Sequence, residues 1–409
     1  MAPRGSQGLV LQRHGDGGQT VVEFGLDDVA YLRSDAGRLA LAEVSRHRLT
    51  DATLVSDIAA ARTLFGDRTG VLVETVKLRR KASAKFADAS GWLFTDDALQ
   101  QATAAPVAEH RARRLAGATV HDATCSIGAE LAALRNWAGF LLGSDIDPVR
   151  LAMARHNLGG SVPLCRADAL RPITVDAVVV VDPARRTGSR RRFDPRSYLP
   201  PLDDLLEVLR DRHHVVKCAP GIDFAVLEQL GFDGEIEVTS LSGSVREACL
   251  WSRGLSDGGV RRRATLLDTG EQLTDTEADG CAVAPAGRWI IDPDGAVVRS
   301  GLVRHYAARH GLWQLDPDIA YLSGDRLPPG VRGFEVMEQL AFDERQLRQA
   351  LSARDAGAVE ILVRGVDVDP DVLRSRLRLR GSAQVTVVIA RLGSGVASRA
   401  TAFICRPSR

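Results

Sequence analysis

The stretch VHDATCSIGAELAAL, from Val120 to Leu134, decides the fold. It predicts a short strand that ends near Asp122, a tight turn, and the beginning of a helix. In doubly wound sheets, ligands bind at turns of this kind, beyond the carboxyl ends of the strands. Such a turn usually opens with glycine, but here the position is occupied by Ser126. We expect Ser126 to fit if its φ angle is negative, and Gly128 to permit close approach of the backbone to a ligand.

Seven short apolar segments follow one another after residue 118, and stretches with helical periodicity separate them. The segments are TVHDA, FLLGSD, VPLCRAD, VDAVVVVDP, HHVVKCAP, EIEVTSL and EACLWSR. Alternation of strands and helices predicts βαβ units and a mostly parallel sheet. AVVVVD is apolar throughout, which is typical of a central strand covered on both faces. The sequence therefore predicts an α/β fold with a Rossmann-like core of seven strands.

The chain has 409 residues, so more than one domain is expected. Residues 1–25 are rich in Gly, Gln and Arg and are predicted to be a loose tail. Residues 26–116 show apolar positions at three- and four-residue spacing, which predicts a helical N-terminal region. We assign residues 117–255 to the Rossmann-like core. Residues 256–409 have their own strands and helices and are predicted to form a small α+β domain.

Composition limits the class of protein. The apolar content of 45% and charged content of 26% are typical of a soluble globular chain. No apolar run approaches the length of a membrane span, and no secretion signal is seen. The six cysteines are scattered without a C-x-x-C pair, which predicts a cytoplasmic protein without a metal site. Net charge is +1, so a global attraction to nucleic acid is not implied.

The acid that ends the first strand helps to decide between two kinds of ligand that Rossmann-like sheets bind. A dinucleotide places its pyrophosphate on the helix N-terminus and needs a G-x-G-x-x-G turn. Asp122 would repel a pyrophosphate, and the turn holds a single glycine. S-adenosylmethionine has a positive sulfonium, a positive ammonium and no phosphate. The sequence therefore favours S-adenosylmethionine as the cofactor.

Three further strands are also predicted to end in aspartate. Asp145 ends the second strand, where it is placed to accept hydrogen bonds from both ribose hydroxyls. Asp168 ends the third strand within reach of an adenine amino group, and Asp182 ends the fourth. A single strand-end aspartate often only caps the next helix, but the ordered set indicates a cofactor site. The residues that follow two of these acids, Ile146 and Ala169, are included in the predicted site.

Two motifs carry a resemblance to the class I S-adenosylmethionine-dependent methyltransferases. DATCSIG is similar to the first motif, D-x-x-C-G-x-G, of the trimethylguanosine synthase-like and related RNA methyltransferases, and Ser126 departs from it. SDIDPVRLAMARHN matches their second motif closely. The resemblance implies a methyltransferase core and S-adenosylmethionine as the cofactor.

A closer resemblance covers most of residues 75–409. The segments KFADASGWLFTDDALQQAT, DPARR, VVKCAP and GLWQLDPDIAYLSGD are similar to those of a bacterial group of class I methyltransferases with a C-terminal THUMP-like domain. THUMP domains are RNA-binding modules, usually attached to RNA-modifying enzymes. The resemblance therefore implies an RNA substrate, rRNA or tRNA, without identifying the base.

In amino-methylating relatives the fourth strand ends in Asn/Asp-Pro-Pro-aromatic, whereas this chain has Asp182-Pro183-Ala184-Arg185. Asp182 is expected to orient an N–H group or act as a base, and Pro183 is retained. Arg185 is predicted to stack on a base or bind a phosphate. The missing ring must come from elsewhere, and the candidates are Trp92, Phe94, Phe193 and Tyr198.

Basic residues near Asp182 are candidates for contacts with the substrate. The segment ARRTGSRRRFDPRSY holds six arginines, either a solvated loop or a clamp for RNA phosphates. We favour the clamp, which would use Arg186, Arg190, Arg191 and Arg192. Lys217 either contacts the substrate or is a solvated strand end. Thr103 is predicted to bind the methionine end of the cofactor, although an ordinary capped helix explains its segment equally well.

Cys218 follows Lys217 and is either a small core thiol, which we favour, or a nucleophile of the kind used in carbon-5 pyrimidine methylation. The sequence as a whole favours a metal-independent, S-adenosylmethionine-dependent methyltransferase that acts on a base in RNA. The alternative is an RNA-binding protein with a vestigial methyltransferase core. The oligomeric state is left open.

Overall fold

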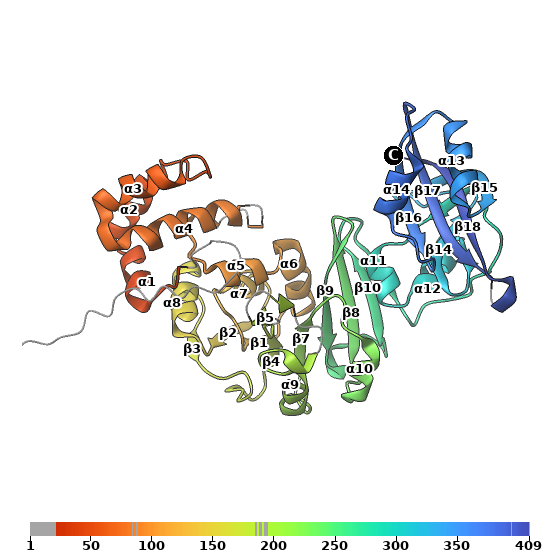
Figure 1. Cartoon of the computed structure of the whole chain (residues 1–409). Helices are drawn as coiled ribbons and strands as arrows, with labels where there is room; N and C mark the ends of the chain where they lie inside the picture. The colour runs from red at the N-terminus through yellow and green to blue at the C-terminus, as the bar shows by residue number, and fades with distance from the viewer. Residues whose placement is uncertain are drawn as a thin grey trace, which may run out of the picture. The chain divides into compact units, whose positions relative to one another are not determined.

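The computed structural model describes residues 22–408 except residues 84, 87–88, 185, 188–189, 192–194 and 394 (Figure 1). The chain divides into two compact units, residues 1–217 and 218–409. The first unit begins with a group of helices and continues into a parallel sheet. The second unit contains a smaller group of strands followed by a separate sheet.

The N-terminal region is helical, as predicted. Its helices are α1 (Leu26–Arg33), α2 (Asp35–Val44), α3 (Leu54–Phe65), α4 (Thr69–Ala82), α5 (Asp96–Gln101) and α6 (Ala105–Arg114). Apolar residues at helical spacing, such as Leu32, Leu41 and Leu72, pack into one core. The Thr95 hydroxyl accepts a hydrogen bond from the Ala98 amide at 3.2 Å and caps α5.

The parallel sheet of the first unit has the strand order β3-β2-β1-β4-β7. Its strands are β1 (Thr119–Asp122), β2 (Phe140–Asp145), β3 (Leu164–Arg166), β4 (Val178–Val181) and β7 (His214–Cys218). The intervening helices are α7 (Ala129–Leu134), α8 (Pro148–Asn157) and α9 (Leu202–Val208). All four residues of β4 are buried, which confirms a strand covered on both faces. The chain passes from one side of β1 to the other between β3 and β4, so the ends of β1 and β4 flank the switch point where ligands bind.

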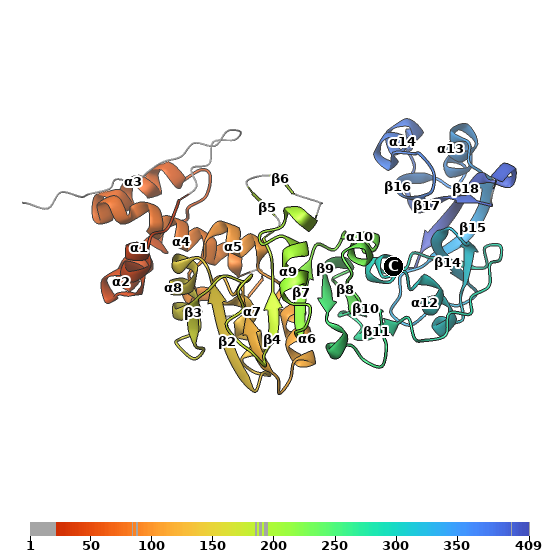
Figure 2. The same ribbon diagram turned by 90° about the horizontal axis from the view of Figure 1, so that it is seen from below.

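The arginine-rich segment after Asp182 forms a short hairpin that the sequence did not predict. Its strands are β5 (Arg186–Thr187) and β6 (Arg190–Arg191), which pair antiparallel (Figure 2). The first strand of the hairpin begins two residues after Ala184, which forms an isolated bridge with Leu199. The backbone therefore turns back after β4 within a few residues of Asp182.

The second unit opens with α10 (Phe224–Gln229) and four strands in the order β9-β8-β10-β11. These are β8 (Glu235–Leu241), β9 (Ser244–Trp251), β10 (Arg262–Leu266) and β11 (Glu271–Thr274). All seven strands of the predicted core are present, as β1 to β4 and β7 to β9. The sequence prediction missed β10 and β11. They follow residue 255, where we had placed a domain boundary, and β10 pairs parallel with β8.

The C-terminal part has its own sheet, of order β13-β14-β12-β15-β18-β17-β16. The strands are β12 (Trp289–Ile291), β13 (Trp313–Asp316), β14 (Ile319–Gly324), β15 (Phe334–Ala341), β16 (Ala356–Arg364), β17 (Ala383–Leu392) and β18 (Arg399–Pro407). The helices are α11 (Gly295–Arg299), α12 (Val303–His310), α13 (Glu344–Ser352) and α14 (Pro370–Leu377). Leu347 of α13 and Leu373 of α14 share one core with β17 residues such as Val387. This arrangement confirms the predicted α+β domain.

None of the helices in the described part of the chain has the length and apolar character needed to cross a lipid bilayer. Across the same residues, no group of three or more His, Cys, Asp or Glu side chains is arranged to hold a metal ion.

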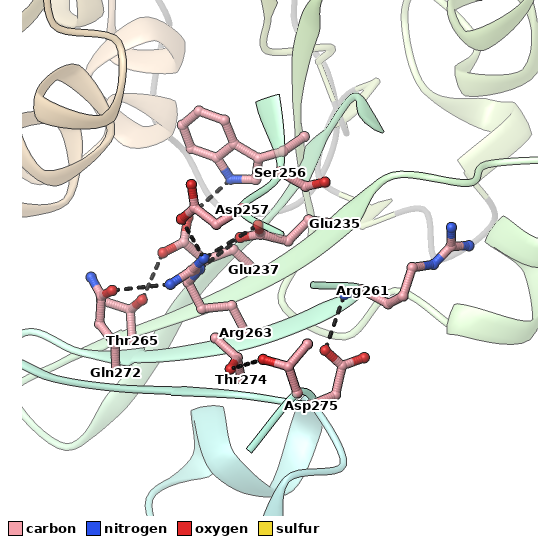
Figure 3. Close-up of polar contacts among 12 residues, drawn as sticks. Glu235, Glu237, Ser256, Asp257, Arg261, Arg263, Thr265, Gln272, Thr274 and Asp275 are labelled. Carbon is pink, nitrogen blue, oxygen red and sulfur yellow. Dashed lines mark hydrogen bonds and ion pairs between the residues drawn. The ribbon is translucent and has the colours of Figure 1, made fainter. Parts of the chain in front are cut away.

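Buried polar contacts join β10 to its neighbours (Figure 3). Arg263 donates from Nε to Glu235 Oε1 at 2.7 Å, from Nη2 to Asp257 Oδ2 at 2.9 Å and from Nη1 to Gln272 Oε1 at 3.1 Å. Glu237 accepts hydrogen bonds from Trp251 Nε1 at 2.9 Å and Thr265 Oγ1 at 2.6 Å. Specific side-chain contacts therefore link β8, β9, β10 and β11.

Replacing Arg263 by methionine tests these contacts. Glu235 is fully buried, so Arg263→Met removes the guanidinium that compensates its charge and should lower the unfolding free energy by about 3–5 kcal/mol. Arg253→Met is the matched control because Arg253 and Asp233 form an exposed pair, and its cost should stay below about 1 kcal/mol. Urea denaturation measures both. Equal costs for the two variants would contradict the importance of the buried contact.

Candidate cofactor and active site

A cavity of about 370 Å³ lies at the carboxyl ends of the strands in the first unit. The four acids predicted from the sequence all line it: Asp122, Asp145, Asp168 and Asp182. So do five other predicted site residues: Thr103, Ser126, Ile146, Ala169 and Lys217. Gly128, Pro183 and Phe94 are outside the lining. The structure thus gathers residues that are spread over 115 positions of sequence, from 103 to 217, around one space.

Asp122 ends β1 and is 2% exposed. Its Oδ1 accepts a hydrogen bond from the Thr124 amide at 3.2 Å, and its Oδ2 has no hydrogen-bond partner among the described residues. Burial, together with the nearby Glu130, raises the pKa of this carboxyl well above its usual range. A buried carboxyl oxygen without a partner at a cavity wall is suited to a cationic or hydrogen-donating ligand group. This fits the positive charges of S-adenosylmethionine.

The turn after β1 corrects one prediction. Ser126 has φ of 49°, in the left-handed region, so the negative angle that we gave as the condition for serine to fit is not found. This conformation costs a residue other than glycine about 1 kcal/mol. The Ser126 amide donates a hydrogen bond to Asp145 Oδ2 at 2.9 Å, which helps to hold the turn. Serine thus adopts a backbone conformation that favours glycine.

Gly128 is needed for the shape of the turn. It has φ of 85° and is the N-terminal cap residue of α7. A Cβ atom at this position would lie 3.0 Å from Leu158 Cδ1. Because Gly128 does not line the cavity, its contribution to binding is through the backbone path of the turn.

Asp145 links the end of β2 to that turn. Its Oδ2 accepts from the Ser126 amide and its Oδ1 accepts from the Asp147 amide, both at 2.9 Å. Each carboxylate oxygen has a second lone pair, so both can still accept hydrogen bonds from hydroxyl groups. Burial raises the pKa of Asp145. Asp168 likewise makes a local hydrogen bond, from the Leu170 amide to Oδ1 at 3.0 Å, and faces the same cavity.

Asp182 follows β4, and its side chain is 28% exposed. Its amide donates to Thr124 Oγ1 at 2.7 Å, which ties it to the turn after β1. Lys217 Nζ lies 2.5 Å from Asp182 Oδ2 and 2.5 Å from Thr103 Oγ1. Sequence reasoning singled out Lys217 and Thr103 separately, but it missed Thr124 and the contacts between these residues. A hydroxyl side chain two residues after Asp122 was the local feature of the sequence that could have identified Thr124.

The residues predicted to contact the substrate differ in where the structure places them. Phe94 is 1% exposed, and its ring packs against Trp92 at a centroid distance of 6.0 Å, so it is a core residue and unavailable to stack on a base. Tyr198 is equally buried. Arg185, Arg192 and Phe193 lie outside the described residues. The backbones of Arg186, Arg190 and Arg191 are in the hairpin that follows Asp182.

The two cysteines near the cavity are buried. Cys125 lines the cavity, and burial raises the pKa of its thiol well above its usual range. Cys218 is fully buried and is not part of the lining, as expected for a core thiol. Thiolate chemistry needs a lowered thiol pKa and access to the substrate, so neither residue has the properties of a nucleophile.

Comparison with known proteins agrees with this geometry. Two Mycobacterium tuberculosis proteins, from strains CDC 1551 / Oshkosh and H37Rv, are each 67% identical to this chain over 357 residues. The match covers 85% of this chain and 100% of each relative, and both are named as uncharacterized S-adenosylmethionine-dependent methyltransferases. A crystal structure from Porphyromonas gingivalis W83, assigned as a methyltransferase, has a TM-score of 0.71. It covers 91% of this chain and 99% of its own at 19% identity, which shows a shared fold.

The chain belongs to the S-adenosylmethionine-dependent methyltransferases. Its cofactor is S-adenosylmethionine, which supplies a methyl group on a positively charged sulfur. Within this class, it is a protein with a C-terminal THUMP-like domain, since the family described as THUMP domain-like matches residues 331–407. That match spans β15 to β18 together with α13 and α14.

The backbone of Ser126 generates a prediction about the turn. Ser126→Gly relieves the left-handed strain and should bind S-adenosylmethionine within about threefold of the unmodified protein. Ser126→Val adds a β-branched side chain at the same φ and should weaken binding by about tenfold or more, or 1.4 kcal/mol. Isothermal titration calorimetry measures both affinities.

Ser242 provides the control for this test because it has φ of 55° and is not part of the cavity lining. Ser242→Val should lower stability and leave cofactor affinity unchanged. Unchanged affinity in Ser126→Val would show that the turn does not govern cofactor binding.

The raised pKa of Asp122 predicts how binding depends on pH. The cationic cofactor favours the ionised carboxylate, so affinity should rise as pH rises above the usual range of a carboxyl group, because Asp122 loses its proton more easily in the complex. Without cofactor the sign is opposite: stability should fall as pH rises above about 3.9, the unfolded value. Asp122→Asn should remove both dependences and weaken binding. Calorimetry and thermal melts over this pH range measure them, and an unchanged pH dependence in the variant would contradict the assignment.

Proposed function

We propose that this protein transfers a methyl group from S-adenosylmethionine to a base in RNA, either rRNA or tRNA, without a metal ion. The observation that carries the proposal is the gathering of four strand-end acids around one cavity, with Asp182 paired to Lys217 at its wall. Methyl transfer needs little besides correct placement of two reactants, which such a cavity provides. An RNA substrate would also place the enzyme in the cytoplasm.

The proposed roles of the acids follow from their positions in the fold. Asp122 offers an unpaired oxygen to a positive group of the cofactor. Asp145 uses its remaining lone pairs for the ribose hydroxyls, and Asp168 faces the adenine amino group. Asp182, whose side chain is 28% exposed, accepts a hydrogen bond from the base to be methylated.

The C-terminal domain supports RNA as the substrate. Its THUMP-like segment carries Arg345 and Arg348 on α13, and Arg378 and Arg380 after α14. All four side chains are exposed, and none has an ion-pair or hydrogen-bond partner in the described part of the domain. Arginines of this kind bind phosphate groups and position nucleic acid without reading its sequence. The arginine-rich hairpin after Asp182 offers a second place for such contacts.

A second candidate function is RNA binding by a protein with a vestigial methyltransferase core. The strained Ser126 and the altered Asp182-Pro183-Ala184-Arg185 motif favour it. The two candidates differ in one measurable property, which is turnover of the cofactor on RNA.

The test is methylation of RNA from cells that lack the gene. The purified protein with methyl-labelled S-adenosylmethionine should label this RNA. RNA from cells that carry the gene should remain nearly unlabelled because its target positions are already methylated. Asp182→Asn should bind the cofactor normally and lose turnover by about 100-fold or more. Mass spectrometry of the digested RNA identifies the nucleoside. Cofactor binding without labelling of any RNA would favour the vestigial core.

A further inference from the structure

Four charged side chains form a chain of contacts, and three of them, Glu130, Lys217 and Asp182, line the cavity. Arg111 of α6 donates from Nε and Nη2 to the two carboxylate oxygens of Glu130 of α7, at 2.7 and 2.8 Å. Glu130 Oε2 lies 3.6 Å from Lys217 Nζ of β7. Lys217 Nζ then contacts Asp182 Oδ2, beyond β4, at 2.5 Å. The signs of the charges alternate along the chain.

Burial distinguishes the last member of this chain from the others. The side chains of Arg111, Glu130 and Lys217 are 2%, 9% and 6% exposed, whereas that of Asp182 is 28% exposed. Charges at such depth persist only when opposite charges compensate them. Burial alone would raise the pKa of Glu130, but Arg111 and Lys217 hold it below its usual value. An ionised Glu130 in turn favours the charged form of Lys217.

Lys217 also reaches the segment between α5 and α6. Its Nζ donates to Thr103 Oγ1 at 2.5 Å, and Thr103 lines the cavity together with Gln101 and Ala102. The ammonium group therefore has the oxygens of Thr103, Glu130 and Asp182 around it. On Asp182 it engages Oδ2, while Oδ1 has no hydrogen-bond partner among the described residues.

We propose that Lys217 is a positioning residue that fixes one oxygen of Asp182, so that the other accepts a hydrogen bond from the atom to be methylated. Glu130, held by Arg111, keeps the ammonium group of Lys217 in place. The inference rests on the proposed function, because it takes Asp182 as the group that meets the acceptor base. It deepens that function by naming the class of acceptor.

The acceptor class is a nitrogen or oxygen atom that carries a hydrogen. A carboxylate that only accepts hydrogen bonds aligns an N–H or O–H group so that the lone pair of the acceptor atom can attack the methyl carbon. As the new bond to carbon forms, the carbon–sulfur bond breaks with its electron pair on sulfur, and the proton of the acceptor passes to the carboxylate of Asp182. Methylation of a pyrimidine carbon instead requires an enzyme nucleophile to activate the ring, and the two cysteines nearest the cavity are buried, as described above. The geometry thus favours an amino, imino or hydroxyl group of the base.

The experiment compares Lys217→Met, which keeps the length of the side chain and removes its charge, with Lys217→Arg, which keeps the charge. Crystal structures with S-adenosylhomocysteine report the position of Asp182. In Lys217→Met the carboxylate should leave its place, while cofactor affinity stays within about threefold and kcat on RNA falls about 100-fold with little change in KM. Lys217→Arg should restore the carboxylate position and much of kcat. Lys77→Met, at an exposed pair with Glu74, is the matched control and should behave as the unmodified protein.

The outcomes are distinguishable. An unmoved Asp182 in Lys217→Met, or an unchanged kcat, would overturn the positioning role. If Lys217→Met does not fold, Lys217→Arg decides: loss of kcat with Asp182 still in place would overturn the proposal. The crystal structures need no substrate, so a failure of the unmodified protein to methylate RNA would contradict only the proposed function. A carbon-methylated nucleoside in the product would overturn the acceptor class.

Discussion

The structure depends on buried cations that compensate the negative charge of acids at the edge of a parallel sheet. The carboxyl ends of adjacent parallel strands meet at one edge, so acids placed there lie close together and partly out of water. Asp122 and Asp182 are gathered in this way, and Glu130 joins them from the first turn of α7. The cations of Lys217 and Arg111 lie beside these acids. Lys217 lies between Glu130 and Asp182, and Arg111 pairs with Glu130, which allows a cluster of acids to exist where a positively charged cofactor must bind.

The acids of the site are not compensated equally: some have a cation beside them and others do not. Glu130 is fully engaged and ionised, whereas Asp122 keeps one oxygen without a partner and resists ionisation. A site that satisfied every carboxylate from within the protein would have no affinity left for a cationic ligand. Asp122 and Glu130 both line the cavity, but Glu130 is engaged by Arg111 and Lys217, whereas one oxygen of Asp122 has no partner among the described residues.

The fold of the core and the set of acids were predictable because they follow from local patterns. Apolar runs of strand length are visible one segment at a time, and a strand-end aspartate is visible next to its strand. The contacts of Glu130 were not predictable, since Arg111 and Lys217 are 19 and 87 positions away in the chain. Ser126 was misread for a different reason: hydrogen bonding to Asp145 holds it in a conformation that its own preferences disfavour. Phe94 was misplaced because composition does not tell a core ring from a stacking ring.

The polar contacts around Arg263 affect how the chain can be divided for study. Composition around residues 254–275 suggests a linker, yet β10 carries Arg263 and Thr265 into contact with Glu235 and Glu237 of β8. A fragment that begins at residue 256 would separate these partners and expose two orphaned carboxylates on the other piece. Any autonomous C-terminal module must therefore start beyond β11. The glycine-rich segment before β10 connects two strands of the same sheet and does not separate two domains.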